Sequence, residues 1–184
     1  MFERKCPECG VRDSYPSGAF DVVVEGGSKY PDVLGCGAYP FLILSESVIN
    51  DWKDAGITAF ETYPVGIAEV KSKKLQDVSA PNYYRVEFSG KCKIDLEASG
   101  FKVLNKCKSC GHITLDSPLV YEYHIVPDSW DGSPIFRDSD IFPRVIFCTE
   151  LIVQLAKKNK RTNFRFSLMD QPEDFFSKGL DYLK

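Results

Sequence analysis

Two short cysteine motifs, far apart in the chain, have the residue types and spacing of a metal site. Residues 6–10 read CPECG and residues 107–111 read CKSCG. A gap of two residues lets both thiolates of one turn point at a single ion, and the glycine relieves the tight turn that follows. Four sulfurs complete the tetrahedral shell of a structural Zn²⁺ and leave no open position for a catalytic water. The sequence therefore predicts a structural zinc site formed by Cys6, Cys9, Cys107 and Cys110.

Two other interpretations of these motifs stay open. In the first, the motifs are two unrelated turns with buried or free thiols. In the second they are redox pairs, and a redox pair usually lies at the start of a helix that lowers the thiol pKa. Neither motif precedes a helical pattern, which favours a metal site over redox chemistry. The other three of the seven cysteines are Cys36, Cys92 and Cys148, and none has a partner at metal-site spacing. An odd total, with four cysteines in the motifs, indicates a reducing compartment rather than a disulfide framework.

The composition is that of a folded protein of the cytoplasm. The 184 residues are 43% hydrophobic and 27% charged, which suits a single compact domain over residues 1–184. The net charge of -3 argues against a general nucleic-acid binder and is compatible with a protein partner. No apolar run reaches the roughly 18 residues of a membrane helix, and no signal peptide is visible, so we expect a cytoplasmic protein without a membrane partner.

Short strands and two main helices are expected to position the motifs. Ser45 is predicted to cap a helix that ends at Gly56, and Thr149 to cap a second helix that includes Ala156. Period-two alternation predicts an antiparallel meander over residues 84–104. The remaining patterns predict strands at 20–25, 40–44, 57–63, 65–70, 119–125, 144–147 and 163–168, and a short helix at 172–178.

The two halves of the sequence resemble each other. Residues 43–64 fall on residues 147–168 without a gap, with four identities, and the first cysteine motif falls on the second at a nearly equal offset. We expect an α+β fold of two pseudo-repeated halves, about 1–80 and 82–184. Each half would be mainly antiparallel strands with one principal helix, and a zinc-ribbon-like four-cysteine site would join them. Coincidence between two ordinary strand–helix–strand units is the alternative.

No recognisable catalytic motif is present, so the chain is not expected to be an enzyme. It has two histidines, neither of them in a known catalytic pattern. A turn-rich acidic segment contains Asp128, Trp130 and Asp131. An aromatic anchor among carboxylates is typical of a protein-binding hot spot, which makes these three residues the predicted partner contacts. A solvated loop is the alternative.

The double motif resembles the double-CxxCG motif proteins of myxobacteria and their relatives, which include immunity proteins against polymorphic toxins. The resemblance rests on the two CxxCG motifs and on a C-terminal pattern: IFR at 135–137, VIF at 145–147, a helix capped at Thr149-Glu150 and TNFRF at 162–166. Asn163 stands where glycine is more usual in that pattern, and Thr149 where serine is.

This resemblance implies a function without chemistry. The protein would bind and neutralise a cognate toxin inside the cell, often through an acidic face opposite a basic toxin. The alternative function is that of a zinc-ribbon protein that binds nucleic acid or acts in regulation, which the net charge of -3 does not favour.

Overall fold

The described residues of the computed structural model form an α+β fold with parallel and antiparallel strand pairs. They are residues 2–15, 19–35, 42–116, 122–138, 141–142, 145–167 and 169. Two helices and twelve strands lie in these ranges: β1 (Phe2–Lys5), β2 (Arg12–Tyr15), β3 (Phe20–Val24), β4 (Val33–Leu34), β5 (Leu42–Ser45), α1 (Glu46–Asp54), β6 (Phe60–Val70), β7 (Tyr83–Phe88), β8 (Lys91–Cys92), β9 (Lys102–Lys106), β10 (Ile113–Asp116), β11 (Ile135–Asp138), β12 (Phe147–Cys148) and α2 (Glu150–Lys158).

The largest sheet carries helix α1 on one face. Its strand order is β3-β6-β7-β5-β4, with β3 parallel to β6 and the other pairs antiparallel. The buried face of α1 presents Val48, Ile49 and Trp52 to the buried strand residues Val86 and Phe88. The ring centroids of Trp52 and Phe88 are 6.3 Å apart. Helical periodicity in the sequence therefore identifies the packing face of this helix.

Both helices begin where the sequence predicts, but the predicted capping bonds do not form. Ser45 and Thr149 are the N-cap residues, and both have extended backbones. Neither side chain accepts a hydrogen bond from a backbone N–H of its helix, and the hydroxyl of Ser45 donates to Asp32 instead. The backbone N–H of Ser45 donates to the carbonyl of Asp32, and that of Thr149 donates to the carbonyl of Pro134, both at 2.9 Å. Each helix start is thus fixed by a backbone bond to a preceding segment.

The predicted meander over residues 84–104 is wrong, because β7 and β8 belong to different sheets. Strand β7 pairs with β5 and β6, whereas β8 pairs in parallel with β11 in a sheet of order β12-β11-β8. The chain crosses between the sheets at Gly90. A Cβ at this position would lie 2.2 Å from the carbonyl oxygen of Ile135 and 2.7 Å from Cβ of Ser133. Only a residue without a side chain allows this close approach.

Substitution of Gly90 by alanine is therefore expected to destabilise the fold. The clash is with backbone, so the second sheet must shift, and the expected loss is about 2–4 kcal/mol in the free energy of unfolding. Urea-induced unfolding followed by circular dichroism measures this loss. Gly26→Ala is the matched control, because a Cβ at Gly26 meets no atom within 4 Å. Equal stability of the two variants would show that Gly90 has no such role.

Strand β6 continues through Pro64, although the sequence predicts a break there. The described pairing of β6 with β3 begins at Val65, so Pro64 lies beyond the end of that neighbour. On its other side Pro64 stands opposite Tyr84 of β7. A proline lacks a backbone N–H and is tolerated where a strand has no neighbour that needs this donor.

The predicted strand at 163–168 is not observed in its described part. Residues 163–167 have no regular structure, and Asn163 has a φ of 63°. The side chain of Asn163 donates to the carbonyl of Val33 at 2.7 Å, so this segment is held by a side-chain contact to β4 rather than by a ladder. The predicted helix at 172–178 lies outside the described residues.

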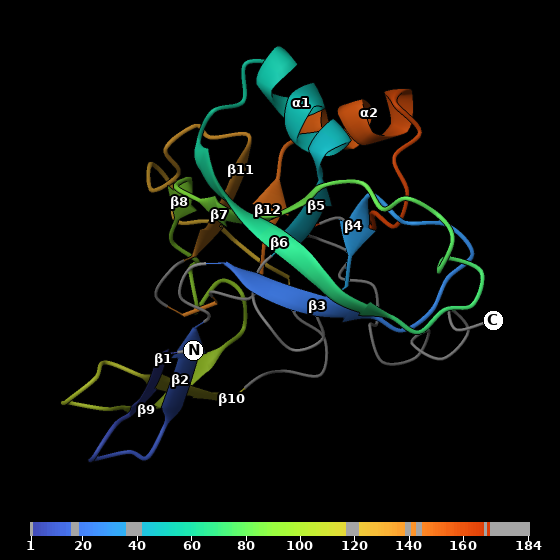
Figure 1. The fold of residues 1–184 in the computed structure, drawn as a ribbon. Coiled ribbons are helices and arrows are strands. Elements are labelled where there is room, and N and C mark those ends of the chain that lie inside the picture. The colour runs from blue at the N-terminus through green and yellow to red at the C-terminus, as the bar shows by residue number, and fades with distance from the viewer. Residues whose placement is uncertain are drawn as a thin grey trace.

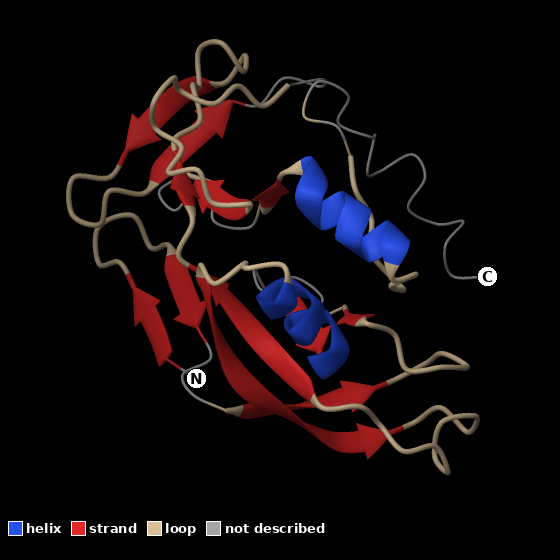
Figure 2. Ribbon diagram, turned by 90° about the horizontal axis from the view of Figure 1, so that it is seen from above, coloured by secondary structure: helices blue, strands red, loops and turns tan. Residues whose placement is uncertain are grey.

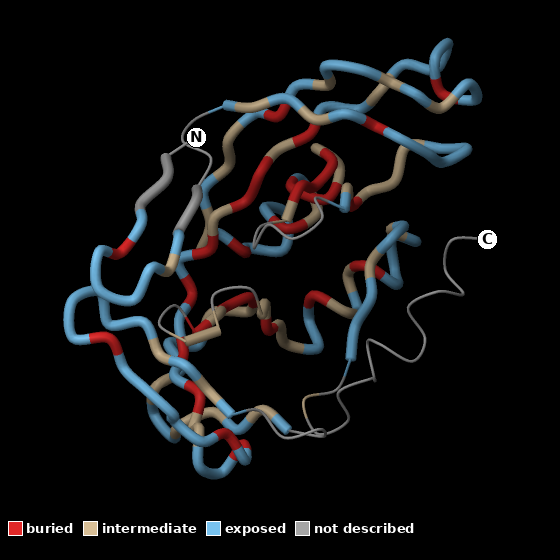
Figure 3. The backbone as a smooth tube through the Cα atoms, turned by 90° about the horizontal axis from the view of Figure 1, so that it is seen from below, coloured by how far each residue is buried: buried red, intermediate tan, exposed pale blue. Residues whose placement is uncertain are grey.

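The two helices lie side by side, and the two small hairpins project from the opposite side of the molecule (Figure 1). Figure 2 shows α1 above the large sheet and α2 beside the second sheet. Buried residues concentrate in the helices and the strands next to them, while those hairpin residues whose burial is described are mostly exposed (Figure 3). Each helix has nine residues, so neither of these two is long enough to cross a bilayer.

Candidate metal centre

Each cysteine motif forms the tip of a two-stranded antiparallel hairpin. The first hairpin pairs β1 with β2 and the second pairs β9 with β10. The last pair before the first tip is Lys5 with Arg12, and the last pair before the second tip is Lys106 with Ile113. The positions correspond one to one at an offset of 101 residues, so the two tips have the same loop length and register.

The backbone of the two tips is also the same. In the first tip the N–H of Cys6 donates to the carbonyl of Val11 at 2.8 Å, and the N–H of Gly10 donates to the carbonyl of Cys6 at 3.0 Å. The second tip repeats both bonds at equal lengths, 101 residues later. Gly10 and Gly111 have φ values of 71° and 75°, which favour glycine. The glycine of each motif is therefore required by the turn.

The four cysteine sulfurs meet between the two tips. Sγ of Cys6 lies 3.8 Å from Sγ of Cys107, and Sγ of Cys9 lies 3.6 Å from Sγ of Cys110. All four sulfurs lie within 4.8 Å of one another. A tetrahedron with Zn–S bonds of about 2.3 Å has edges of about 3.8 Å, so the observed spacing fits such an ion. The prediction that these cysteines come together is confirmed, and the arrangement is close enough to hold a metal ion.

The cluster has a buried side and an exposed side. Cys6 and Cys107 are buried, while Cys9 and Cys110 are exposed. Hydrogen bonds from the backbone N–H groups of Cys9 and Glu8 lower the pKa of Cys6 to about 6. Backbone hydrogen bonds act in the same direction on the other three cysteines, but burial and hydrogen bonds with neighbouring thiols outweigh them and raise the pKa of each. Cys6 is therefore the thiol that ionises first, and the thiolate is the form that binds metal.

The first tip also contacts the second through a carboxylate. Oε2 of Glu8 accepts a hydrogen bond from the backbone N–H of Ser109 at 2.9 Å and lies 3.5 Å from Sγ of Cys107. Glu8 and Ser109 occupy the same position in their two motifs, the residue just before the second cysteine. No sequence pattern around Glu8 predicts this contact.

The other described cysteines lie away from the cluster. Burial raises the pKa of the Cys92 thiol to about 11, helped by the charge of Asp138, and burial raises the pKa of Cys148 to about 11. These thiols pack in the interior and are unreactive at neutral pH. Cys36 lies outside the described residues.

The three predicted partner-binding residues lie in one loop before β11. Trp130 is 42% exposed, its Nε1 donates to the carbonyl of Ser133 at 3.0 Å, and its ring packs on Phe136 at 5.4 Å between centroids. Asp128 is exposed and has a φ of 61°. Trp130 is thus held in place while part of its ring stays open to solvent.

Asp131 is fixed by the loop itself. Its carboxylate accepts hydrogen bonds from the backbone N–H of Lys91 at 3.0 Å and from that of Ser133 at 2.9 Å. Burial works against the charged form, but hydrogen bonds from Ser133 and Lys91 outweigh it and lower the pKa of Asp131. Asp131 therefore orders the loop that presents Trp130.

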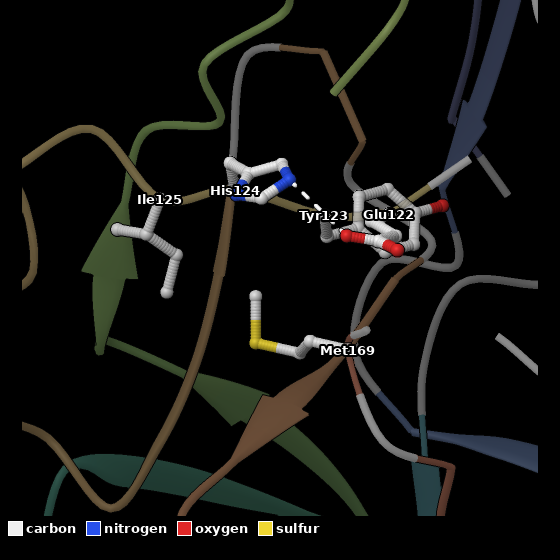
Figure 4. Close-up of a pocket in the computed structure, with 5 residues that line it drawn as sticks. All are labelled: Glu122, Tyr123, His124, Ile125 and Met169. Carbon is white, nitrogen blue, oxygen red and sulfur yellow. Dashed lines mark ion pairs between the residues drawn. The ribbon is translucent and has the colours of Figure 1, made fainter. Parts of the chain in front are cut away.

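Two cavities lie apart from the cysteine cluster. The first, of about 300 Å³, is lined by Glu122, Tyr123, His124, Ile125 and Met169. Nε2 of His124 lies 3.5 Å from Oε2 of Glu122, both side chains are about half exposed, and the other three lining residues are apolar or aromatic (Figure 4). Among the described lining residues, none is a Ser, Thr, Cys or Lys nucleophile that could act beside the histidine.

The second cavity, of about 320 Å³, lies between the two helices and the segment after α2. Its lining is mainly apolar and includes Trp52, Ile152 and Phe164. Among the described residues, the cysteine cluster alone brings three or more potential metal ligands together.

Fold and site together define the class of the protein: an α+β protein in which two hairpins from distant parts of the chain form a possible four-cysteine metal site. A comparison with models of known protein families finds no match, and a comparison with curated protein sequences finds none either.

Proposed function

We propose that Cys6, Cys9, Cys107 and Cys110 bind one structural Zn²⁺ in a zinc-ribbon-like site. Four thiolates from two hairpin tips at tetrahedral spacing support this assignment. Four protein ligands complete the zinc shell, so the ion has no position for a substrate or an attacking water. Its role is to fasten the start of the chain to its middle.

We also propose that the chain consists of two related halves, about 1–80 and 82–184, within one domain. The two hairpin tips share register and hydrogen bonds, and α1 and α2 are nine-residue helices whose starts are 104 residues apart. The backbone bonds that fix Ser45 and Thr149 at the helix starts correspond as well. In this architecture the zinc ion lies where the two halves meet.

We propose that the protein is an immunity protein that binds and neutralises a cognate polymorphic toxin in the cytoplasm. The double-CxxCG resemblance points to this function, and the observation that carries it here is the closed four-cysteine cluster that joins the two hairpins. A rigid scaffold with a saturated metal site is suited to binding without chemistry. The proposal assigns no catalytic role to any residue.

Co-expression with a candidate toxin domain from a neighbouring gene tests the proposal. Cells that carry both are expected to survive, and the two proteins are expected to co-purify as a stable complex. Continued toxicity together with the absence of a complex would refute the immunity function.

Within this proposal Trp130, Asp128 and Asp131 form the partner contact. Substitution of Trp130 by alanine is expected to weaken the complex at least tenfold, or about 1.4 kcal/mol, because it removes a partly exposed aromatic anchor. Titration calorimetry with the toxin domain measures the change, and circular dichroism checks the fold. Val78→Ala is a matched surface control, since Val78 is 49% exposed and lies outside this loop. A loss smaller than tenfold would remove Trp130 from the interface.

Nucleic-acid binding or a regulatory role is the second candidate, and one observation favours it. Lys102, Lys106 and Lys108 are all exposed on the second hairpin, in a chain whose net charge is -3. A basic projection of this kind suits contacts to phosphates. Binding of a fluorescent oligonucleotide that weakens with salt, and weakens further when the three lysines are replaced by glutamine, would support this candidate over the first.

A further inference from the structure

Glu8 makes a contact that links the two cysteine motifs directly. Its Oε2 accepts the backbone N–H of Ser109 at 2.9 Å, and the same oxygen lies 3.5 Å from Sγ of Cys107. The partners are 101 and 99 residues away in the sequence. Apart from the sulfurs themselves, this carboxylate is the group through which the first tip reaches the second in the described hydrogen bonds.

An exposed glutamate normally extends into water, because ordering its side chain costs rotamer entropy. Glu8 is exposed, yet it is directed at a single N–H group on the opposite tip. The hydrogen bond to the N–H group of Ser109 offsets this cost. The contact therefore holds the second tip against the first.

The charge of Glu8 alone would work against a metal site. Four thiolates around Zn²⁺ already carry a net charge of -2, and a further carboxylate 3.5 Å from one sulfur repels them. The favourable contribution must come from the hydrogen bond, which fixes the position of Ser109 and, two residues earlier, of Cys107. Groups that orient metal ligands in this way are as much a part of a site as the ligands.

We propose that Glu8 is a positioning residue that aligns the second cysteine motif for metal binding. This inference rests on the proposed zinc site. The carboxylate does not ligate the ion. It holds Cys107 and Cys110 in position opposite Cys6 and Cys9. The second motif therefore loses less conformational entropy when the ion binds.

Metal titrations of three variants test this role. In Glu8→Ala the acceptor is lost, and the apparent dissociation constant for Zn²⁺ is expected to rise about 10–100-fold in competition with a chelating dye. Glu8→Gln keeps an acceptor oxygen and removes the charge, so it is expected to bind at least as tightly as the wild type. Ser109→Ala keeps the backbone N–H and is the matched control, with no expected change.

Hydrogen exchange in the metal-free protein distinguishes the alignment of the second cysteine motif from an effect on the stability of the whole fold. In the metal-free, reduced protein, amide hydrogen exchange at Ser109 is expected to be slow in the wild type and in Glu8→Gln, and fast in Glu8→Ala. The visible absorption of bound Co²⁺ should keep its tetrahedral thiolate form in all variants, because the ligands are unchanged.

The outcomes distinguish a failure of the role of Glu8 from a failure of the proposed zinc site. If the wild type binds no metal, the proposed zinc site is refuted. If the wild type binds metal and the dissociation constant of Glu8→Ala is within about threefold of the wild-type value, only the role of Glu8 is refuted. Such a difference is below the 10–100-fold cost of lost ligand support. Equal weakening of Glu8→Gln and Glu8→Ala would also overturn the role, since it would make the charge rather than the hydrogen bond responsible.

Discussion

Substitution of Cys107 by serine is expected to abolish stoichiometric Zn²⁺ binding and to separate the two hairpins. Cys107 is buried on the inner side of the cluster, and its sulfur lies 3.8 Å from that of Cys6. Structural zinc in small domains contributes about 10–16 kcal/mol of apparent binding free energy, which also stabilises the folded state. The second hairpin has little core of its own, since every residue of β9 is exposed. Elemental analysis measures the zinc, and hydrogen exchange measures the hairpins.

The effect should be confined to the hairpins. Helix α1 and the large sheet share a buried cluster that contains no motif cysteine, so their amides are expected to stay protected in Cys107→Ser. Cys92→Ala is the matched control, because Cys92 is a buried cysteine outside the cluster. This variant should keep its zinc although it loses some core packing. Loss of zinc in both variants, or in neither, would contradict the assignment.

Substitution of Arg161 by methionine is expected to cause a large loss of stability at a place far from the metal site. Nε of Arg161 lies 2.6 Å from Oδ2 of Asp51, and Nη1 lies 3.4 Å from Oδ1 of Asp32. Nη1 also donates to the hydroxyl of Ser47 at 2.9 Å. All three charged side chains are less than one-fifth exposed. Loss of the cation leaves two part-buried carboxylates without their counter-ion, at an expected cost of about 2–4 kcal/mol.

The pH dependence of this loss has a defined sign. The hydrogen bond from Arg161 lowers the pKa of Asp51. Burial opposes ionisation of Asp32, but hydrogen bonds from Thr162 and Ser45 and the charge of Arg161 outweigh it and lower its pKa. Both carboxyls ionise at lower pH in the folded state than in the unfolded chain, where Asp has a pKa of about 3.9. Their stabilisation is therefore complete at neutral pH and is lost as the pH falls through the folded pKa values.

Urea unfolding of the wild type and Arg161→Met at several pH values checks this prediction. The difference between the two proteins should be full at pH 7 and shrink at strongly acid pH. Lys158→Met is the matched control: this exposed lysine ends α2, and its loss should change stability by less than about 0.5 kcal/mol. A pH-independent difference would show that Arg161 acts through packing rather than charge.

The cysteine cluster and the two helices were predictable because their signals are local. A CxxCG motif specifies its own turn, and both tips indeed place glycine at a positive φ. Apolar spacing identifies the buried faces of the helices, as at Trp52 and Ile152. That the two motifs share one ion could be predicted because a structural zinc requires four ligands and each motif supplies two.

The sheet pairing was not predictable in the same way. Alternation in β7 and β8 predicts strands but does not indicate which strands they pair with. The close approach at Gly90, where the chain crosses from one sheet to the other, depends on the distant residue Ile135. Arg161 and Glu8 likewise act on partners about 100 residues or more away. Their sequence surroundings, a basic run and a cysteine motif, give no sign of these contacts.

The zinc content of a variant that lacks only the first motif tests the central claim most directly. A single site shared by both tips predicts one Zn²⁺ per chain in the wild type and none in Cys6→Ser/Cys9→Ser, although Cys107 and Cys110 remain. Native mass spectrometry of the reduced protein, with X-ray absorption to identify four sulfur ligands, gives this count. Zinc retained by the variant, or a wild-type content of zero or of more than one ion per chain, would contradict a shared four-cysteine centre.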